Sequence, residues 1–276
     1  MRPEQTILFS DLDGTLFDSM GRVGQRNREA IARYLAAGGR FALSTGRAPL
    51  NALRFIGDVP TNAPSVVFNG AGVYDFSTRQ YGFLRHLDKE KTFPLFRWAL
   101  DSIPDLDLQI YTDTQILYVT PLERAHPGFL EIHQPTRYVP LEELWDAPVV
   151  KALLLPGQAH GLAALGEKLR PAAAGSFDLK LGAVLLGTPV RYYEMMPLDA
   201  TKGAALRALR GQRALQGRTV LAAGDYWNDL ELMQEADVAV APANAIPEIR
   251  ALSRFTVCSN DEGVIADIVE RVIPQL

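Results

Sequence analysis

Four short apolar runs in this chain each end abruptly in small or polar residues, and this pattern constrains the fold more than any other feature. The runs cover residues 7–9, 41–43, 65–68 and 219–223, and they are followed by Ser10-Asp11, Ser44-Thr45-Gly46, Asn69-Gly70 and Gly224-Asp225. Runs of this length with turn residues behind them are typical of buried β-strands. Stretches with helical spacing, at 25–37 and 49–56, separate the first three runs.

The order strand, helix, strand, helix, strand predicts βαβ units, and therefore an α/β fold with a Rossmann-like, doubly wound parallel sheet. In such a sheet, ligands bind at the carboxyl ends of the strands. We therefore expect Asp11, Thr45, Asn69 and Asp225 to converge, although they lie far apart in the sequence.

The middle of the chain has a different rhythm. Strands are expected at 108–111, 116–119, 149–155 and 177–186 and helices at 89–100 and 160–169, with prolines at 121, 127, 135, 140 and 148. After residue 194 the α/β rhythm returns, with helices expected at 201–210, 227–234 and 263–272 and a strand at 238–240. We expect an α+β cap domain at 83–193, inserted into a core domain formed by 1–82 and 194–276.

The pattern Asp11-x-Asp13-Gly14-Thr15 places two carboxylates at a junction between a strand and a turn. One carboxylate can act as a nucleophile and the other as a general acid/base, and a bound Mg²⁺ would neutralise their charge beside a phosphate. The same letters also occur in plain turns and in calcium loops. A calcium loop of the EF-hand type needs a later glutamate and flanking helices, which are absent here.

Taken together, the motifs resemble the haloacid dehalogenase-like (HAD) superfamily of phosphatases. Residues 7–16 resemble its first motif, Ser44-Thr45-Gly46-Arg47 the second, Lys202-Gly203 the third, and Gly224-Asp225-x-x-Asn228-Asp229 the fourth. Phe68-Asn69-Gly70-Ala71 and residues 260–264 resemble the Cof-type branch, which carries its cap at the C2 position after the third strand. The sequence departs from that branch at Pro242-Ala243-Asn244, where relatives commonly have Gly before Asn.

The resemblance implies a phosphatase that forms a phosphoaspartate on Asp11. In such an enzyme Asp13 protonates the leaving oxygen and later activates water. Thr45 hydrogen-bonds the transferring phosphoryl group, and Lys202 neutralises the nucleophile and the phosphate. This is the positioning and charge stabilisation that phosphoryl transfer demands.

The resemblance also implies Mg²⁺ as the cofactor. The ion would be held by Asp11, by the backbone carbonyl of Asp13 and by Asp225, with Asn228 and Asp229 completing or supporting the site. The residues implied to contact the substrate are Gly46, Arg47, Asn69, Gly70 and Asn228.

Each of these residues also has an ordinary structural interpretation. Lysine and arginine are usually solvated at the surface, which would describe Lys202 and Arg47. Asn69-Gly70 is a strong turn signal without any ligand. The histidines 86, 126, 133 and 160 all fall in the expected cap. A single one of them can contact a substrate, but they lack the clustering that a zinc site needs.

Charge, cysteine content and the length of the apolar runs limit the partners and the cellular compartment that we expect. The formal net charge is −4, so the basic excess of nucleic-acid binders is missing. Cys258 is the single cysteine, which excludes an intrachain disulfide and fits a reducing compartment. No apolar run approaches the ~18 residues that span a membrane, and the first run is too short for a signal peptide. We expect a cytoplasmic protein, a monomer or a small homo-oligomer.

Three other functions compete with a phosphatase of small phosphorylated metabolites such as sugar phosphates, nucleotides or phosphorylated cofactors. A phosphomutase or phosphotransferase would share the core motifs and pass the phosphoryl group to a second hydroxyl. A non-catalytic binding protein on the same scaffold would tolerate loss of Asp11. Dehalogenation or phosphonate cleavage is disfavoured by Asp13, since such reactions do not need that leaving-group acid.

Overall fold

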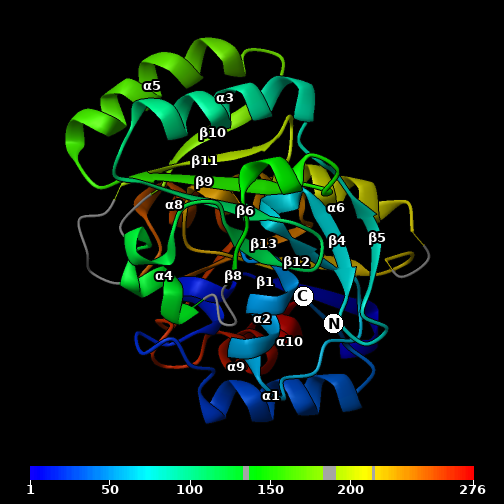
Figure 1. The fold of residues 1–276 in the computed structure, drawn as a ribbon. Coiled ribbons are helices and arrows are strands. Elements are labelled where there is room, and N and C mark those ends of the chain that lie inside the picture. The colour runs from blue at the N-terminus through cyan, green and yellow to red at the C-terminus, as the bar shows by residue number, and fades with distance from the viewer. Residues whose placement is uncertain (133–136, 183–190, 213–214) are drawn as a thin grey trace. The chain divides into compact units, whose positions relative to one another are not determined.

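The computed structural model describes residues 1–132, 137–182, 191–212 and 215–276 (Figure 1). The chain divides into two compact units, one formed by Met1–Phe83 with Thr201–Leu276 and one by Leu84–Ala200. The described residues contain no helix that is long and apolar enough to cross a membrane.

The first unit is built on a parallel sheet with the strand order β14-β13-β12-β1-β2. Its strands are β1 (Thr6–Ser10), β2 (Arg40–Leu43), β12 (Thr219–Ala223), β13 (Val238–Pro242) and β14 (Phe255–Val257). Every pairing in this sheet is parallel, as the alternation of apolar runs and helical stretches predicted. The sheet confirms the expected α/β class, and it puts β1 between β12 and β2.

Both faces of this sheet are buried. Leu8 belongs to one apolar cluster, whereas its neighbours Ile7 and Phe9 belong to another, because successive side chains of a strand point to opposite faces. The helices of this unit are α1 (Gln25–Ala36), α2 (Pro49–Ile56), α6 (Lys202–Arg210), α7 (Leu230–Glu235), α8 (Pro247–Leu252), α9 (Val264–Asp267) and α10 (Ile273–Gln275). Packing between these two apolar layers holds β1 in place, and with it Asp11 at the end of the strand.

The third predicted strand is present, but it does not belong to the parallel sheet. β3 (Ser65–Val67) pairs antiparallel with β4 (Gly72–Asp75), which continues into β5 (Gln80–Leu84), so the three form a separate sheet. A single parallel bridge between Ser44 and Val66 ties this sheet to the end of β2. The chain reverses between β3 and β4 within the turn that contains Asn69 and Gly70, and the turn thereby lies beside the end of β2.

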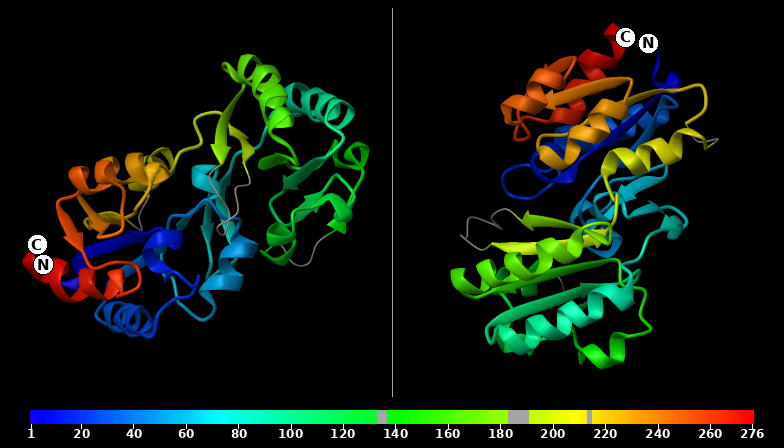
Figure 2. Two further views of the ribbon diagram at one scale, coloured as in Figure 1. Left: turned by 90° about the vertical axis from the view of Figure 1, so that its left-hand side faces the viewer. Right: turned by 90° about the horizontal axis from the view of Figure 1, so that it is seen from above.

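The second unit holds a six-stranded sheet with the order β10-β11-β9-β6-β7-β8. Its elements are α3 (Lys89–Ser102), β6 (Leu106–Tyr111), β7 (Ile116–Tyr118), α4 (Pro127–Ile132), β8 (Arg137–Tyr138), β9 (Lys151–Pro156), α5 (Ala159–Ala173), β10 (Phe177–Gly182) and β11 (Tyr192–Pro197). Helices α3 and α5 pack on one face of this sheet through a shared apolar cluster (Figures 1 and 2).

The boundary between the units differs from the sequence expectation at one point. The sequence pattern placed residues from 194 onward in the core, but β11 pairs with β9 and β10 through residues 192–197 and so completes the second sheet. The strand expected at 177–186 is seen as β10 up to Gly182, and its remainder lies outside the described residues.

Candidate active site

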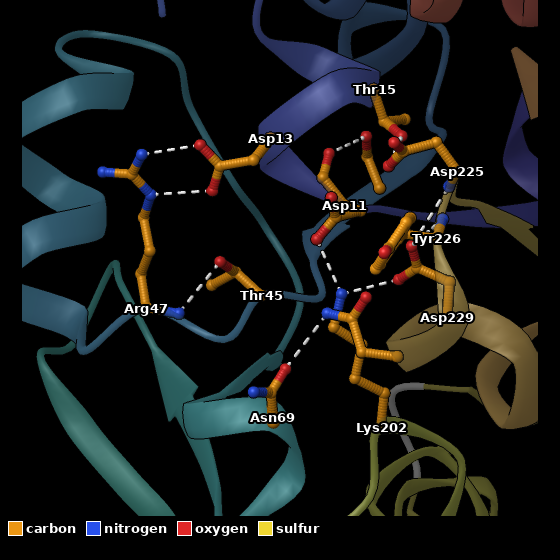
Figure 3. Close-up of polar contacts among 12 residues, drawn as sticks. Asp11, Asp13, Thr15, Thr45, Arg47, Asn69, Lys202, Asp225, Tyr226 and Asp229 are labelled. Carbon is orange, nitrogen blue, oxygen red and sulfur yellow. Dashed lines mark hydrogen bonds and ion pairs between the residues drawn. The ribbon is translucent and has the colours of Figure 1, made fainter. Parts of the chain in front are cut away.

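Four polar turns meet where the strands of the first unit end. The backbone N–H of Asp11 donates to Ala223 O (2.9 Å) at the end of β12. The N–H of Ser44 donates to Ser10 O (2.8 Å), and that of Thr45 to Val66 O (2.9 Å). These bonds extend the strand pairings by one residue each. Asp11, Thr45, Asn69 and Asp225 therefore lie around one edge of the sheet, as the sequence predicted (Figure 3).

Lys202 lies at the centre of this group. Its ammonium Nζ is 2.6 Å from Asp11 Oδ1 and 2.6 Å from Asp229 Oδ1, and its side chain is fully buried. The interpretation of Lys202 as a solvated surface residue is therefore wrong. Burial opposes the charge of a lysine, but the two carboxylates outweigh that effect and raise the pKa of Lys202 above its usual value.

Local sequence explains how Lys202 reaches this position. Thr201 caps α6, because its side-chain oxygen accepts from the N–H of Ala204 (3.1 Å), and the helix begins at Lys202. Gly70 has a φ of +102°, and a Cβ there would overlap the carbonyl oxygen of Thr201. A glycine is thus required for the turn after β3 to approach the start of α6.

Three carboxylates share this buried edge. The oxygens of Asp11, Asp225 and Asp229 lie within 4.8 Å of one another, and within the described residues no other group of acidic, histidine or cysteine side chains is gathered this closely. Burial raises the pKa of Asp11 well above its usual value, although Lys202 opposes this shift. Burial, with Asp229 adding to it, raises the pKa of Asp225 to about 7.

Asp229 also organises the turn that carries Asp225. Its Oδ2 accepts from the backbone N–H of Asp225 (3.1 Å) and of Tyr226 (3.3 Å), while its Oδ1 binds Lys202. Thr15 donates to Asp225 Oδ1 (3.3 Å) from the other side. Asp11 and Asp225 therefore have fewer protein partners than Asp229.

Asp13 lies apart from the other three acids, of which Asp11 and Asp229 are buried and Asp225 is partly buried. Its carboxylate is 59% exposed and receives both Nε (2.9 Å) and Nη2 (2.6 Å) of Arg47. The guanidinium of Arg47 in turn stacks on Phe55, 4.5 Å from the ring centre, and on Phe17 at 5.5 Å. Arg47 is therefore held in place at the site, and it is not a free surface residue.

The second and third turns form a polar cradle beside Asp11. The N–H of Arg47 donates to Thr45 Oγ1 (3.1 Å), and the N–H of Asn69 donates to Thr45 O (3.0 Å). Asn228 reaches across from the fourth motif and donates to Asn69 Oδ1 (3.2 Å). Gly46 faces the same amide, since a Cβ at residue 46 would lie 2.8 Å from Asn69 Oδ1.

Two residues at the same edge belong to stretches compared with the Cof-type branch, but the sequence reasoning assigned them no role at the site. Asn244, after β13, donates to Gly14 O (2.8 Å), and Asn260, after β14, donates to Phe17 O (3.0 Å). Both follow strand ends of the same parallel sheet, so the rule that found Asp11 and Asp225 could have found them. Among the expected histidines, 86, 126 and 160 belong to the second unit, and His133 lies outside the described residues.

A family model of the haloacid dehalogenase-like hydrolases matches residues 8–269 of the chain. The chain belongs to this family. Its Cof-type motifs run in family order along nearly the whole length of the match, and the resemblance noted in the sequence is thereby confirmed.

Relatives with known names share this family and most of the chain length. The 5-amino-6-(5-phospho-D-ribitylamino)uracil phosphatase YwtE of Bacillus subtilis is 26% identical and covers 95% of this chain and 96% of its own. The putative phosphatase YxeH of the same organism is also 26% identical, with coverages of 97% and 98%. A haloacid dehalogenase-like hydrolase from Bacteroides thetaiotaomicron has the same fold, with a TM-score of 0.82, 23% identity and coverages of 97% and 99%. The protein is accordingly a HAD-family phosphatase.

Proposed function

We propose that the protein hydrolyses a small phosphate monoester through a phosphoaspartate formed on Asp11. The observation that carries this proposal is the contact between the buried Asp11 carboxylate and the ammonium of Lys202, 2.6 Å apart. A carboxylate can approach a dianionic phosphoryl group only if positive charge compensates for both. Lys202 supplies one such charge at a fixed point.

In the first step Asp11 attacks phosphorus, the P–O bond to the leaving group breaks, and Asp13 gives its proton to the leaving oxygen. In the second step Asp13 takes a proton from water, which attacks phosphorus and releases inorganic phosphate and free Asp11. The exposed carboxylate of Asp13 suits this shuttle, because it can exchange protons with solvent. We assign Arg47, whose guanidinium binds Asp13, to contact with the substrate, as the resemblance implied.

The cradle around Thr45 would hold the transferring phosphoryl group. The hydroxyl of Thr45, the amides of Asn69 and Asn228, and the backbone around Gly46 and Gly70 can all donate hydrogen bonds to phosphate oxygens. These groups are fixed by the bonds among their own turns, and so they would cost little reorganisation during transfer.

The acidic residues fit a magnesium ion. Asp11, Asp225 and Asp229 bring three carboxylates against the single ammonium of Lys202, so a divalent cation would compensate the two further charges that arise when all three are ionised. Carboxylate oxygens are the ligands that Mg²⁺ prefers. Asp11, Asp225 and the carbonyl of Asp13 would hold the ion, and Asp229 would support them. When bound, Mg²⁺ supplies charge neutralisation for the nucleophile and the phosphate.

We assign selection of the substrate to the unit formed by Leu84–Ala200, as the C2 cap that the resemblance implied. The substrate class that this assignment favours is a small phosphorylated metabolite such as a sugar phosphate, a nucleotide or a phosphorylated cofactor. Fold alone does not choose among these compounds.

Phosphate release from a panel of phosphorylated metabolites tests the proposal, with and without Mg²⁺. The natural protein is compared with Asp11→Asn and with Asp146→Asn, a matched change at a carboxylate that is 93% exposed. We expect magnesium-dependent release that disappears in Asp11→Asn and persists in Asp146→Asn. Mass spectrometry of the quenched enzyme should show one added phosphoryl group on the peptide that contains Asp11. Release that survives Asp11→Asn would rule out the phosphoaspartate.

A further inference from the structure

Two loops outside the four motifs hold the segment that follows Asp13. The side chain of Asn244 donates from Nδ2 to Gly14 O (2.8 Å), and its Oδ1 accepts from the backbone N–H of Asn260 (2.9 Å). The side chain of Asn260 then donates to Phe17 O (3.0 Å). Three hydrogen bonds in series thus fasten both ends of the segment 14–17 to the loops after β13 and β14.

The same segment is connected to the carboxylate of Asp13 by a second route. The ring of Phe17 lies under the guanidinium of Arg47, and that guanidinium binds both oxygens of Asp13. Asn260 holds the backbone of Phe17, while Asn244 holds the residue directly after Asp13. The first route acts on the backbone at Gly14, next to Asp13, and the second acts on the side chain of Asp13.

We propose that Asn244, oriented by Asn260, is a positioning residue for Asp13. The proposal rests on the proposed function, in which Asp13 is the acid that protonates the leaving group. Packing cannot hold this carboxylate, because more than half of it is exposed. Gly14 has a φ of +80° and lacks the steric limits of other residues, so the hydrogen bond from Asn244 to its carbonyl restricts the backbone next to Asp13.

The orientation of the Asn244 amide follows from its two partners. The N–H of Asn260 can only donate, and the carbonyl of Gly14 can only accept, so the amide must present its oxygen to one and its nitrogen to the other. Asn244→Asp keeps the bond from Asn260 but places two acceptors against each other at Gly14. Asn244→Ala removes both bonds and adds no charge.

Leaving-group dependence separates a positioning role from a merely structural one. An alkyl phosphate needs a proton on its leaving oxygen, whereas p-nitrophenyl phosphate releases a stable phenolate and needs little acid assistance. Displacing a catalytic group by about 1 Å can cost on the order of 100-fold in rate. For Asn244→Ala we expect kcat/KM, which reports formation of the phosphoaspartate and not its hydrolysis, to fall by roughly 10- to 100-fold on the alkyl phosphate and by less than about 3-fold on p-nitrophenyl phosphate.

Three further variants complete the test. Asp13→Asn should show the same selectivity, meaning a larger fall in rate on the alkyl phosphate than on p-nitrophenyl phosphate. Adding Asn244→Ala to Asp13→Asn should lower neither rate further, because both changes act on one group. Asn260→Ala should give the same pattern in weaker form. Arg250→Ala is the matched control, because Arg250 binds the carbonyl of Ala243 (3.0 Å) in the same loop, while the bonds to Gly14 and Phe17 come from Asn244 and Asn260. The ratio of its rates on the two substrates should equal that of the natural protein.

The outcomes distinguish the two proposals. If Asp13→Asn loses more activity on the alkyl phosphate, but Asn244→Ala and Asn260→Ala lose equal activity on both substrates, the positioning role alone is overturned. An equal fall in kcat/KM on both substrates in Asp13→Asn itself would overturn the acid role of Asp13, and the positioning role with it. Melting temperatures of all variants identify any loss that comes from unfolding.

Discussion

Lys202 Nζ lies 2.6 Å from Asp11 Oδ1, although 191 residues separate the two in the chain. This contact joins the start of α6 to the end of β1 inside the first unit. Because both groups are buried, each one depends on the other to remain charged. Changes at either residue should therefore affect stability as well as catalysis.

Lys202→Met should destabilise the protein and abolish phosphate release. The change leaves Asp11 and Asp229 buried without their common counter-charge, and breaking a buried pair in this way costs about 3–5 kcal/mol. Urea unfolding measures the effect. Lys91→Met, at a half-exposed lysine, should change stability by less than about 0.5 kcal/mol. Equal stability of the two variants would contradict the buried contact.

Asp225→Asn should weaken magnesium binding. The change removes one of the least partnered carboxylates of the buried cluster, so we expect the Mg²⁺ concentration for half-maximal activity to rise by at least ~10-fold. Titration calorimetry, and the rise in melting temperature on adding Mg²⁺, measure binding without activity. Asp146→Asn, on an exposed carboxylate, should bind the ion like the natural protein. An unchanged affinity in Asp225→Asn would place the ion elsewhere.

Gly70→Ala should lower both stability and activity. Any side chain at residue 70 meets the carbonyl of Thr201 and forces the start of α6, including Lys202, to move. The loss of stability should exceed about 1 kcal/mol. Gly217→Ala separates strain from overlap, because Gly217 also has a positive φ (+70°) but no atom lies within 4 Å of its added Cβ. Normal activity in both variants would show that this turn does not position Lys202.

Asp267→Asn should reduce the stability of the protein at neutral pH, and this loss of stability should be smaller at acid pH. Hydrogen bonds from Arg271 (2.5 and 2.8 Å), with one from the N–H of Cys258 (3.0 Å), lower the pKa of Asp267. A carboxylate with a lowered pKa in the folded state stabilises the protein above its unfolded pKa, and this contribution is lost as the pH falls through the folded value.

Melting temperatures from pH 7 down to about pH 3 compare the two proteins. The natural protein should be more stable at neutral pH by about 1 kcal/mol, and the two curves should approach each other at the acid end. A constant gap over the whole range would mean that the charge of Asp267 does not contribute.

The local pattern of apolar residues was sufficient to predict many of the strands and helices of the core domain. The runs before Asp11 and Asp225 became neighbouring parallel strands, and the helices at 25–37 and 49–56 appear with nearly the same limits. Apolar periodicity is a property of adjacent residues and survives in any fold that buries them. The strand β4, the short α8 and the edge strand β14 were missed, because short elements carry little periodic signal.

The sequence by itself determined that polar residues follow the ends of parallel strands, and hence that Asp11, Thr45, Asn69 and Asp225 meet. Only the tertiary structure decided that Lys202 is buried between Asp11 and Asp229, that Arg47 binds Asp13, and that β11 closes the second sheet. Strand ends converge through the geometry of the sheet alone. A hydrogen-bond partner depends on which distant loops the packed chain brings within about 3 Å, and no local pattern contains that information.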